Sequence, residues 1–116
     1  MRFRREQHLR RQDDFRAVRE QGRRIDCGAF TLWHLTRDDP GIRVGVVAST
    51  AAVGPAVQRN RAKRRLRAIF RENQGLVPRG TDLLLVARAA VNRWESRELT
   101  EKFIGACRRL APAKES

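Results

Sequence analysis

The residues that could do chemistry are concentrated in one basic stretch, AVQRNRAKRRLRAIFR, from Ala56 to Arg71. Seven cations and no acid lie between Arg59 and Arg71. Like charges at helical spacing repel by a few tenths of a kcal/mol per pair, so a partner outside the chain must offset that cost. Arginine, which far outnumbers lysine in this chain, presents a flat fork of five donors that fits phosphate and stacks on bases. The chemistry indicated is the binding of a polyanion.

At 100° per residue, this stretch forms an amphipathic helix. The apolar residues gather on one side, and a polar row spaced 4, 3 and 4 runs along the other for roughly 16 Å. Arg59 lies nearer the apolar edge, so it could hold a phosphate or be partly structural. A merely solvated basic face is the alternative, but exposed helices usually mix signs, and this one has no acid before Glu72. The candidate binding residues, here called the basic stripe, are Arg59, Asn60, Arg61, Lys63, Arg64, Arg67 and Arg71.

Composition points the same way. The 116 residues carry 26 Lys and Arg against 13 Asp and Glu, a net charge of +13 and a pI near 11.6, which favours a nucleic-acid partner. No apolar run approaches the roughly 20 residues that span a bilayer, and we expect no membrane association. No signal peptide is apparent. Cys27 and Cys107 have no metal-ligand spacing and are expected to be buried thiols in a reducing cytoplasm.

The sequence offers no arrangement typical of a stand-alone nuclease. Such an enzyme needs acids for two metal ions or a histidine-based acid–base pair. Asp13 and Asp14 are better explained by a helix start, where the helix dipole favours acids. Ser49, His34 and Cys27 form no recognisable set of nucleophile and base. We therefore assign no catalytic residue and no metal ligand to the chain.

The elements that must position the stripe follow from periodicity and turn residues. We expect a basic arm over 1–8, and a helix over 12–21 that Gly22 ends in the left-handed conformation. Strands at 29–36 and 42–49 flank a turn and are expected to pair as an antiparallel hairpin. The run 81–87 is apolar throughout and predicts a buried central strand. A last helix begins near Ser96, its expected N-cap, and the tail 111–116 is expected to fray.

With a possible further strand near Asp26, the order is helix, strand, strand, helix, strand, helix. This predicts a single α+β domain over 1–116, a two-layer sandwich with a small mixed four-stranded sheet and about three helices. The chain has no helix-turn-helix pair, zipper or zinc-finger spacing, which argues against DNA. Aromatic residues on the first strand and first helix, Trp33 and Phe15, suit RNA, whose unpaired bases stack on rings.

The basic stretch resembles the signature of the bacterial ribonuclease P protein subunit, with its RNR core at Arg59-Asn60-Arg61. The resemblance extends over about residues 3–110. It includes LRRQDDFRAVREQG from Leu9 to Gly22, the strand segments GAFTLWHL and RVGVVAST, and TDLLLVAR with the final helix.

This resemblance implies an RNA-binding subunit of the ribonucleoprotein that removes the 5′ leader from precursor tRNA. The RNA subunit would hold the Mg²⁺ ions and perform the hydrolysis, while the protein alone would bind no cofactor. Its implied partners are ribonuclease P RNA and precursor tRNA, in the cytoplasm, with no obligate protein partner. The basic stripe would contact the catalytic RNA, and a left-handed βαβ crossover is also implied. The implied leader-binding cleft consists of Phe15, Arg19 and Trp33.

The chain departs from the family pattern at two places. Thr50, Ala51 and Ala52 stand where lysines are common, and Arg19 stands where a second aromatic residue is frequent. Leader binding would then depend more on cations and arginine stacking than on rings. A ribosomal or other structural RNA-binding protein is the alternative function that the charge and fold class allow.

Overall fold

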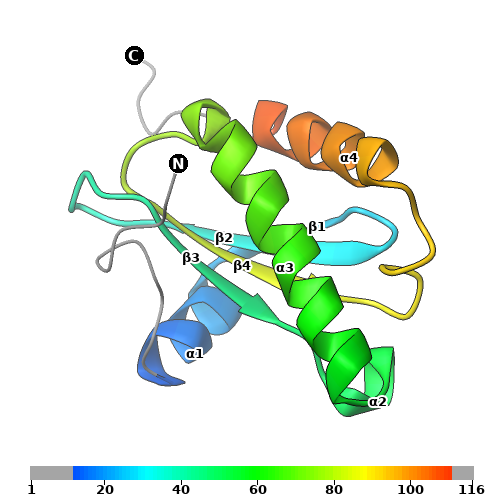
Figure 1. Ribbon diagram of the computed structural model, residues 1–116. Coiled ribbons are helices and arrows are strands. Elements are labelled where there is room, and N and C mark those ends of the chain that lie inside the picture. Colours follow the sequence, from blue (N-terminus) through cyan, green and yellow to red (C-terminus); the bar gives the residue numbers. More distant parts are fainter. Residues whose placement is uncertain (1–11, 111–116) are drawn as a thin grey trace.

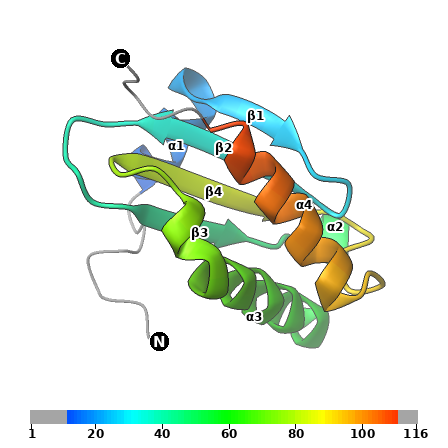
Figure 2. The same cartoon turned by 90° about the horizontal axis from the view of Figure 1, so that it is seen from above.

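The computed structural model describes residues 12–110; the predicted arm over 1–8 and tail over 111–116 lie outside the described residues. One four-stranded sheet forms the centre, with α3 and α4 side by side on one face and α1 on the other (Figure 1). The same layers are seen from above in Figure 2. The predicted α+β fold is thereby confirmed. The elements are α1 Gln12–Gln21, β1 Arg23–Asp26, β2 Phe30–Thr36, β3 Arg43–Val47, α2 Thr50–Val53, α3 Ala56–Asn73, the 3₁₀ turn Gln74–Leu76, β4 Thr81–Ala87 and α4 Ser96–Arg108.

The strands lie in the order β1-β2-β4-β3. Strand β2 pairs antiparallel with both β1 and β4, whereas β3 pairs parallel with β4. The predicted hairpin between β2 and β3 is therefore wrong, because β4 lies between them. Leu83, Leu84 and Leu85 explain the insertion: consecutive side chains point to opposite faces, and all three are fully buried, so β4 needs cover on both faces. The predicted central position of 81–87 is confirmed.

The further strand suspected near Asp26 is β1, and it forms the hairpin that the sheet does contain. Arg23 lies opposite His34, and Asp26 lies opposite Thr31. Between β3 and β4 the chain passes through α3, which makes a parallel βαβ crossover. The left hand of that crossover stays a prediction from the resemblance.

The hydrophobic core divides along the two sheet faces. On the α3 and α4 side, Phe30, Leu32, Leu66, Phe70 and Phe103 are fully buried in one cluster. On the other face, Val18 of α1 packs on Leu84 in a smaller cluster, which half-buried side chains including those of Phe15 and Trp33 complete. The smaller cluster leaves part of the second sheet face accessible, and this is where a cavity forms.

Gly22 ends α1 by a different mechanism from the one predicted. Its N–H donates to Val18 O at 3.0 Å, which is ordinary helical bonding, and it is not among the positive-φ glycines of the described residues. A Cβ at this position would lie 2.3 Å from His34 O and 2.5 Å from Val18 O. Glycine is required here because α1 approaches the backbone of β2 closely.

The N-cap of α4 also differs from the prediction. Glu95, not Ser96, occupies that position, and it forms a capping box with Glu98, whose carboxylate accepts the Glu95 N–H at 3.0 Å. None of the helices within residues 12–110 is both long and apolar enough to cross a bilayer.

Candidate nucleic-acid interface

Helix α3 has the two sides that its periodicity predicts. Ala62, Leu66, Ile69 and Phe70 are its buried residues, and they face the sheet and α4. The basic stripe lies away from them: Asn60, Arg61 and Arg64 are exposed, and Arg59, Lys63, Arg67 and Arg71 are half-buried. Half-burial is ordinary for long cations, because their aliphatic stems lie along the helix while the charged ends reach solvent.

The cations of the basic stripe have no counter-charge in the described part of the chain. Ion pairs there involve other arginines, and the side chains of the stripe make no hydrogen bond to residues 12–110. Arg59, at the apolar edge, even has a buried Nε without a partner in the structure. A row of cations without counter-charges on one side of a helix favours contact with an external anion.

Arg65 is the one cation of the stretch Arg59–Arg71 with a clear structural role. Its guanidinium donates to Val91 O at 2.6 Å and also to Trp94 O, and so ties α3 to the loop that precedes α4. Burial, followed by the charge of Arg61, lowers the pKa of Arg65 below its ordinary value. Arg65 is not among the predicted residues of the basic stripe, and the structure gives it a different role.

Val57 is a surface residue that the sequence reasoning missed. Its side chain is 75% exposed, which makes it one of two large apolar residues standing in solvent among residues 12–110. At i, i+4 and i+7, it shares a face of α3 with Arg61 and Arg64. Val57 therefore places an exposed apolar side chain within this cationic face.

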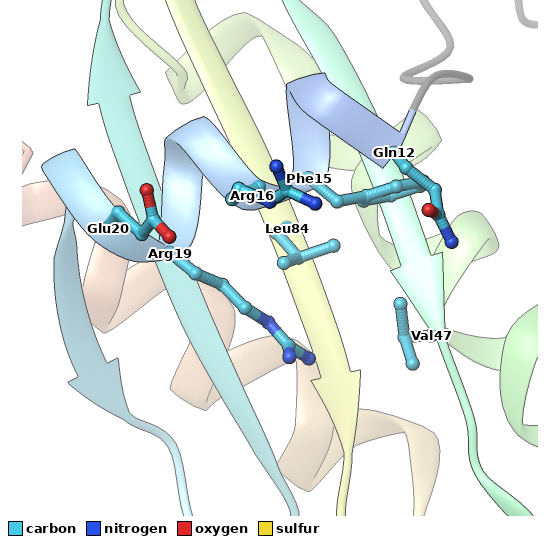
Figure 3. A pocket seen from close by; sticks show the side chains of 7 residues that line it. All are labelled: Gln12, Phe15, Arg16, Arg19, Glu20, Val47 and Leu84. Carbon is cyan, nitrogen blue, oxygen red and sulfur yellow. The ribbon is translucent and has the colours of Figure 1, made fainter.

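A cavity of about 430 Å³ lies on the opposite sheet face, beside α1. The side chains of Phe15 and Arg19 leave α1 toward the sheet with Leu84 between them (Figure 3). The pocket therefore combines an aromatic ring, guanidinium groups and an apolar floor. The lining residues are Gln12, Phe15, Arg16, Arg19 and Glu20 from α1, Val47 from β3 and Leu84 from β4.

Trp33 lies next to this cavity without lining it. It is the direct partner of Leu84 across β2 and β4, and of Arg24 across β1 and β2. The ring is half-buried against the Val18–Leu84 cluster. The structure thus brings Phe15 and Arg19 to one cavity and places Trp33 beside Leu84 on the same sheet face, outside the cavity lining. Val47 and Leu84 are pocket residues that the sequence reasoning missed, because only the pairing of β3 with β4 brings them together opposite α1. Arg16 lies on α1 itself and was also missed.

A set of ion pairs fixes α1 over the sheet at one end of this face. Asp82 of β4 is held by Arg43 of β3 and by Arg37, whose Nε lies 2.6 Å from Asp82 Oδ1. Arg43 also reaches Asp14 of α1 at 3.6 Å. The hydrogen bonds that Arg43 donates to the Asp82 carboxylate, followed by the charges of Asp82, Asp14 and Asp39, raise the pKa of Arg43 above its ordinary value. Asp14 and Asp82 are thus engaged in ion pairs, and the cavity is lined by two arginines, Arg16 and Arg19, and one acid, Glu20.

The two cysteines are free and buried, as expected. Burial raises the pKa of both Cys27 and Cys107 to about 11, so each remains a protonated thiol at neutral pH. Within residues 12–110, no three His, Cys, Asp or Glu side chains are grouped as a metal would require.

Fold and surfaces together define a class: an α+β RNA-binding protein with an uncompensated basic helix on one side of its sheet and an aromatic–cationic cavity on the other. The family model "Ribonuclease P" matches residues 3–111. The chain belongs to the ribonuclease P protein family, and it is a protein subunit of ribonuclease P that acts in tRNA processing.

Similar proteins support this membership over most of the chain. It is 35% identical to the ribonuclease P protein component of Syntrophobacter fumaroxidans, over 89% of this chain and 87% of that one. The component from Acidothermus cellulolyticus is also 35% identical, covering 93% and 91%. The solved ribonuclease P protein from Thermotoga maritima superposes with a TM-score of 0.79 at 27% identity, over 90% of this chain and 97% of that one. These matches favour the ribonuclease P reading over the ribosomal alternative.

Proposed function

We propose that the basic stripe binds the catalytic RNA of ribonuclease P, while the cavity beside α1 binds the 5′ leader of precursor tRNA. The observation that carries the first half is the absence of a counter-charge for the stripe within residues 12–110. The helix presents these cations along roughly 16 Å, a length that covers several successive phosphates of an RNA backbone. Each neutralised phosphate releases counterions, so binding weakens steeply with salt.

The cavity supports the second half through its mixture of groups. Phe15 offers a ring on which an unpaired base can stack, and Leu84 and Val47 form an apolar floor. Arg16 and Arg19 offer guanidinium groups to the backbone of the same strand. Such a surface accepts any base, because every base has a π face and every nucleotide a phosphate. That tolerance suits leaders of differing sequence.

Hydrolysis in this proposal belongs to the RNA subunit. The acids around the sheet are engaged in ion pairs: Asp14 and Asp82 with Arg43, and Asp26 with Arg88. The thiols stay protonated because burial raises their pKa. Mg²⁺ bound to the RNA would supply the Lewis acid for hydrolysis. The protein's part is to hold the RNA and position the leader, in the cytoplasm where precursor tRNA is processed.

Reconstitution tests the proposal directly. The purified protein is mixed with a bacterial ribonuclease P RNA and a precursor tRNA that carries a labelled leader, at low Mg²⁺ concentration. We expect no cleavage by the protein alone and stimulated cleavage by the mixture. Cleavage by the isolated protein, or a mixture no more active than the RNA alone, would contradict the proposal.

A further inference from the structure

A second cavity, of about 480 Å³, lies on the other face of the sheet, between β1, β2 and the C-terminal end of α4. Neighbouring residues of β2 separate the two sites: Trp33 faces the α1 side, and His34 faces the α4 side. This cavity is therefore distinct from the one proposed for the leader. Its lining residues are Arg23, Arg24, Ile25, His34, Thr36, Thr81, Arg109 and Leu110.

The charge around this cavity is positive and unbalanced. Arg23, Arg24 and Arg109 are exposed, and none of them forms an ion pair within residues 12–110. No carboxylate is among the lining residues. Arg23 is the direct cross-strand partner of His34, which places their side chains side by side. Burial, followed by the charges of Arg23 and Arg109, lowers the pKa of His34 below its ordinary value.

The polar groups of the cavity remain available. The imidazole of His34 and the hydroxyl of Thr36 make no hydrogen bond within the described residues, whereas Thr81 Oγ1 donates to Pro78 O at 2.8 Å. Several arginines around one cavity, with further polar groups beside them, suit a tetrahedral oxyanion, because each arginine can offer two parallel N–H groups to its oxygens. An anion here would also relieve the mutual repulsion of the arginines.

We propose that the Arg23–His34–Arg109 cavity binds a phosphate group of an RNA strand, as a contact separate from the basic stripe and the leader cavity. The inference rests on the proposed RNA binding and adds a third surface to it. The strand belongs either to the catalytic RNA or to precursor tRNA, and separate binding measurements distinguish the two. A competing explanation is that Arg23 and Arg24 only protect β1, an edge strand, from pairing with other chains.

The test uses the full chain with Arg23→Gln and Arg109→Gln together, which removes two charges and keeps side chains of similar polarity. The matched control is Arg79→Gln with Arg97→Gln, two exposed arginines outside the cavity. Urea denaturation checks that both variants fold. Affinity for the catalytic RNA is measured by filter binding across a salt series, and affinity of the reconstituted holoenzyme is measured for precursor and mature tRNA.

We expect the cavity variant to bind about 5–20-fold more weakly than the control in one of these measurements. Its log–log salt slope should be shallower by roughly 0.7–0.9, the value for one phosphate.

Weaker binding of the catalytic RNA assigns the bound RNA strand to that RNA, and weaker binding of tRNA alone assigns it to the substrate. Equal affinities for both variants overturn the inference, and lower solubility with unchanged affinity leaves edge protection as the explanation. The variant Arg64→Ala with Arg67→Ala, measured in the same assays, distinguishes failure of this inference from failure of the proposed function. If that variant binds RNA weakly while the cavity variant binds normally, the role of the basic stripe is supported and only this inference is overturned.

Discussion

The guanidinium of Arg43 donates two hydrogen bonds to the carboxylate of Asp82: Nε lies 2.9 Å from Oδ1 and Nη2 lies 2.7 Å from Oδ2. The carboxylate side chain is only 3% exposed, and Arg37 completes its hydrogen bonding. The pair joins the parallel strands β3 and β4 at the end where α1 begins, since Arg43 also contacts Asp14. One buried acid therefore connects both strands and the first helix.

We expect Asp82→Asn to lower the free energy of unfolding by about 2–3 kcal/mol, because it removes the charge that both arginines share. The lower end of the usual range for buried pairs applies, since the arginine side chains are 19% and 27% exposed. Urea denaturation measures the change. Asp39→Asn is the matched control, because Asp39 is 67% exposed and its pair with Arg37 is long, at 3.6 Å. Equal effects of the two substitutions would remove Asp82 from its proposed structural role.

Substitutions at neighbouring arginines of α3 should affect either RNA binding or protein stability, but not both. Arg64→Ala with Arg67→Ala should weaken RNA affinity and flatten the log–log salt slope by roughly 1.4, on the single-strand estimate of 0.7 per phosphate. Stability should change little, because these side chains form no ion pair or hydrogen bond with residues 12–110.

Arg65→Ala should lower stability and leave RNA affinity unchanged. It removes the hydrogen bonds to Val91 O and Trp94 O and should destabilise the fold by about 1–3 kcal/mol. Filter binding and urea denaturation on both variants check the contrast, and a stable Arg65→Ala protein that binds RNA poorly would reverse the assignment.

Phe15 is expected to discriminate precursor from mature tRNA. Phe15→Ala should weaken binding of the leader-bearing substrate by about 1–3 kcal/mol, the usual value of a base stacked on a ring, and leave mature tRNA unaffected. The measurement is the ratio of the two dissociation constants for the reconstituted holoenzyme. Because Phe15 also packs against the Val18–Leu84 cluster, the stability of the variant is measured alongside. A loss of the same size for both tRNAs would mean that the ring acts through packing alone.

Trp33→Ala provides the comparison for that experiment. The ring was predicted to contact the leader, yet it lies beside Leu84 and outside the cavity lining. Because the ring is only half-buried, we now expect its removal to lower the free energy of unfolding by about 2 kcal/mol, less than for a fully buried tryptophan, and to affect both tRNAs alike. Selective loss of precursor binding would instead restore the original prediction for Trp33.

Alanine substitutions at two glycines should change the free energy of unfolding in opposite directions. Gly22→Ala should destabilise by about 1–3 kcal/mol, because the new Cβ would lie 2.3 Å from His34 O and α1 would have to move off β2. Gly105, within α4, has open space where a methyl group would be added, with no atom within 4 Å, so Gly105→Ala should stabilise by about 0.5–1 kcal/mol through helix propensity. Thermal denaturation of the pair provides the measurement, and a neutral Gly22→Ala variant would contradict the close approach.

Local patterns predicted most elements, because each depends on residues close in sequence. The periodicity of Ala56–Arg71 identified both sides of α3, and the apolar run 81–87 identified a strand buried on both faces. The hairpin prediction for β2 and β3 failed because residues far apart in sequence decide which strands pair. The three consecutive leucines of β4 are buried because β4 lies between β2 and β3. The function of Gly22 was missed for the same reason, since its constraint is the backbone of His34 on another element.

By itself, the sequence determined the chemistry of this protein: a net charge of +13, carried largely by arginine, and a helix whose cations fall on one side because 3.6 residues complete a turn. The tertiary structure alone decided how the remaining groups are shared between binding and support. The pairing of β3 with β4 made Arg43 a structural donor, and the packing of α3 against the loop before α4 did the same for Arg65. Trp33 came to lie beside Leu84 outside the cavity lining, and Arg23, His34 and Arg109 came to line a second cavity. These roles depend on contacts between residues distant in the chain, and such contacts exist only once the sheet has formed.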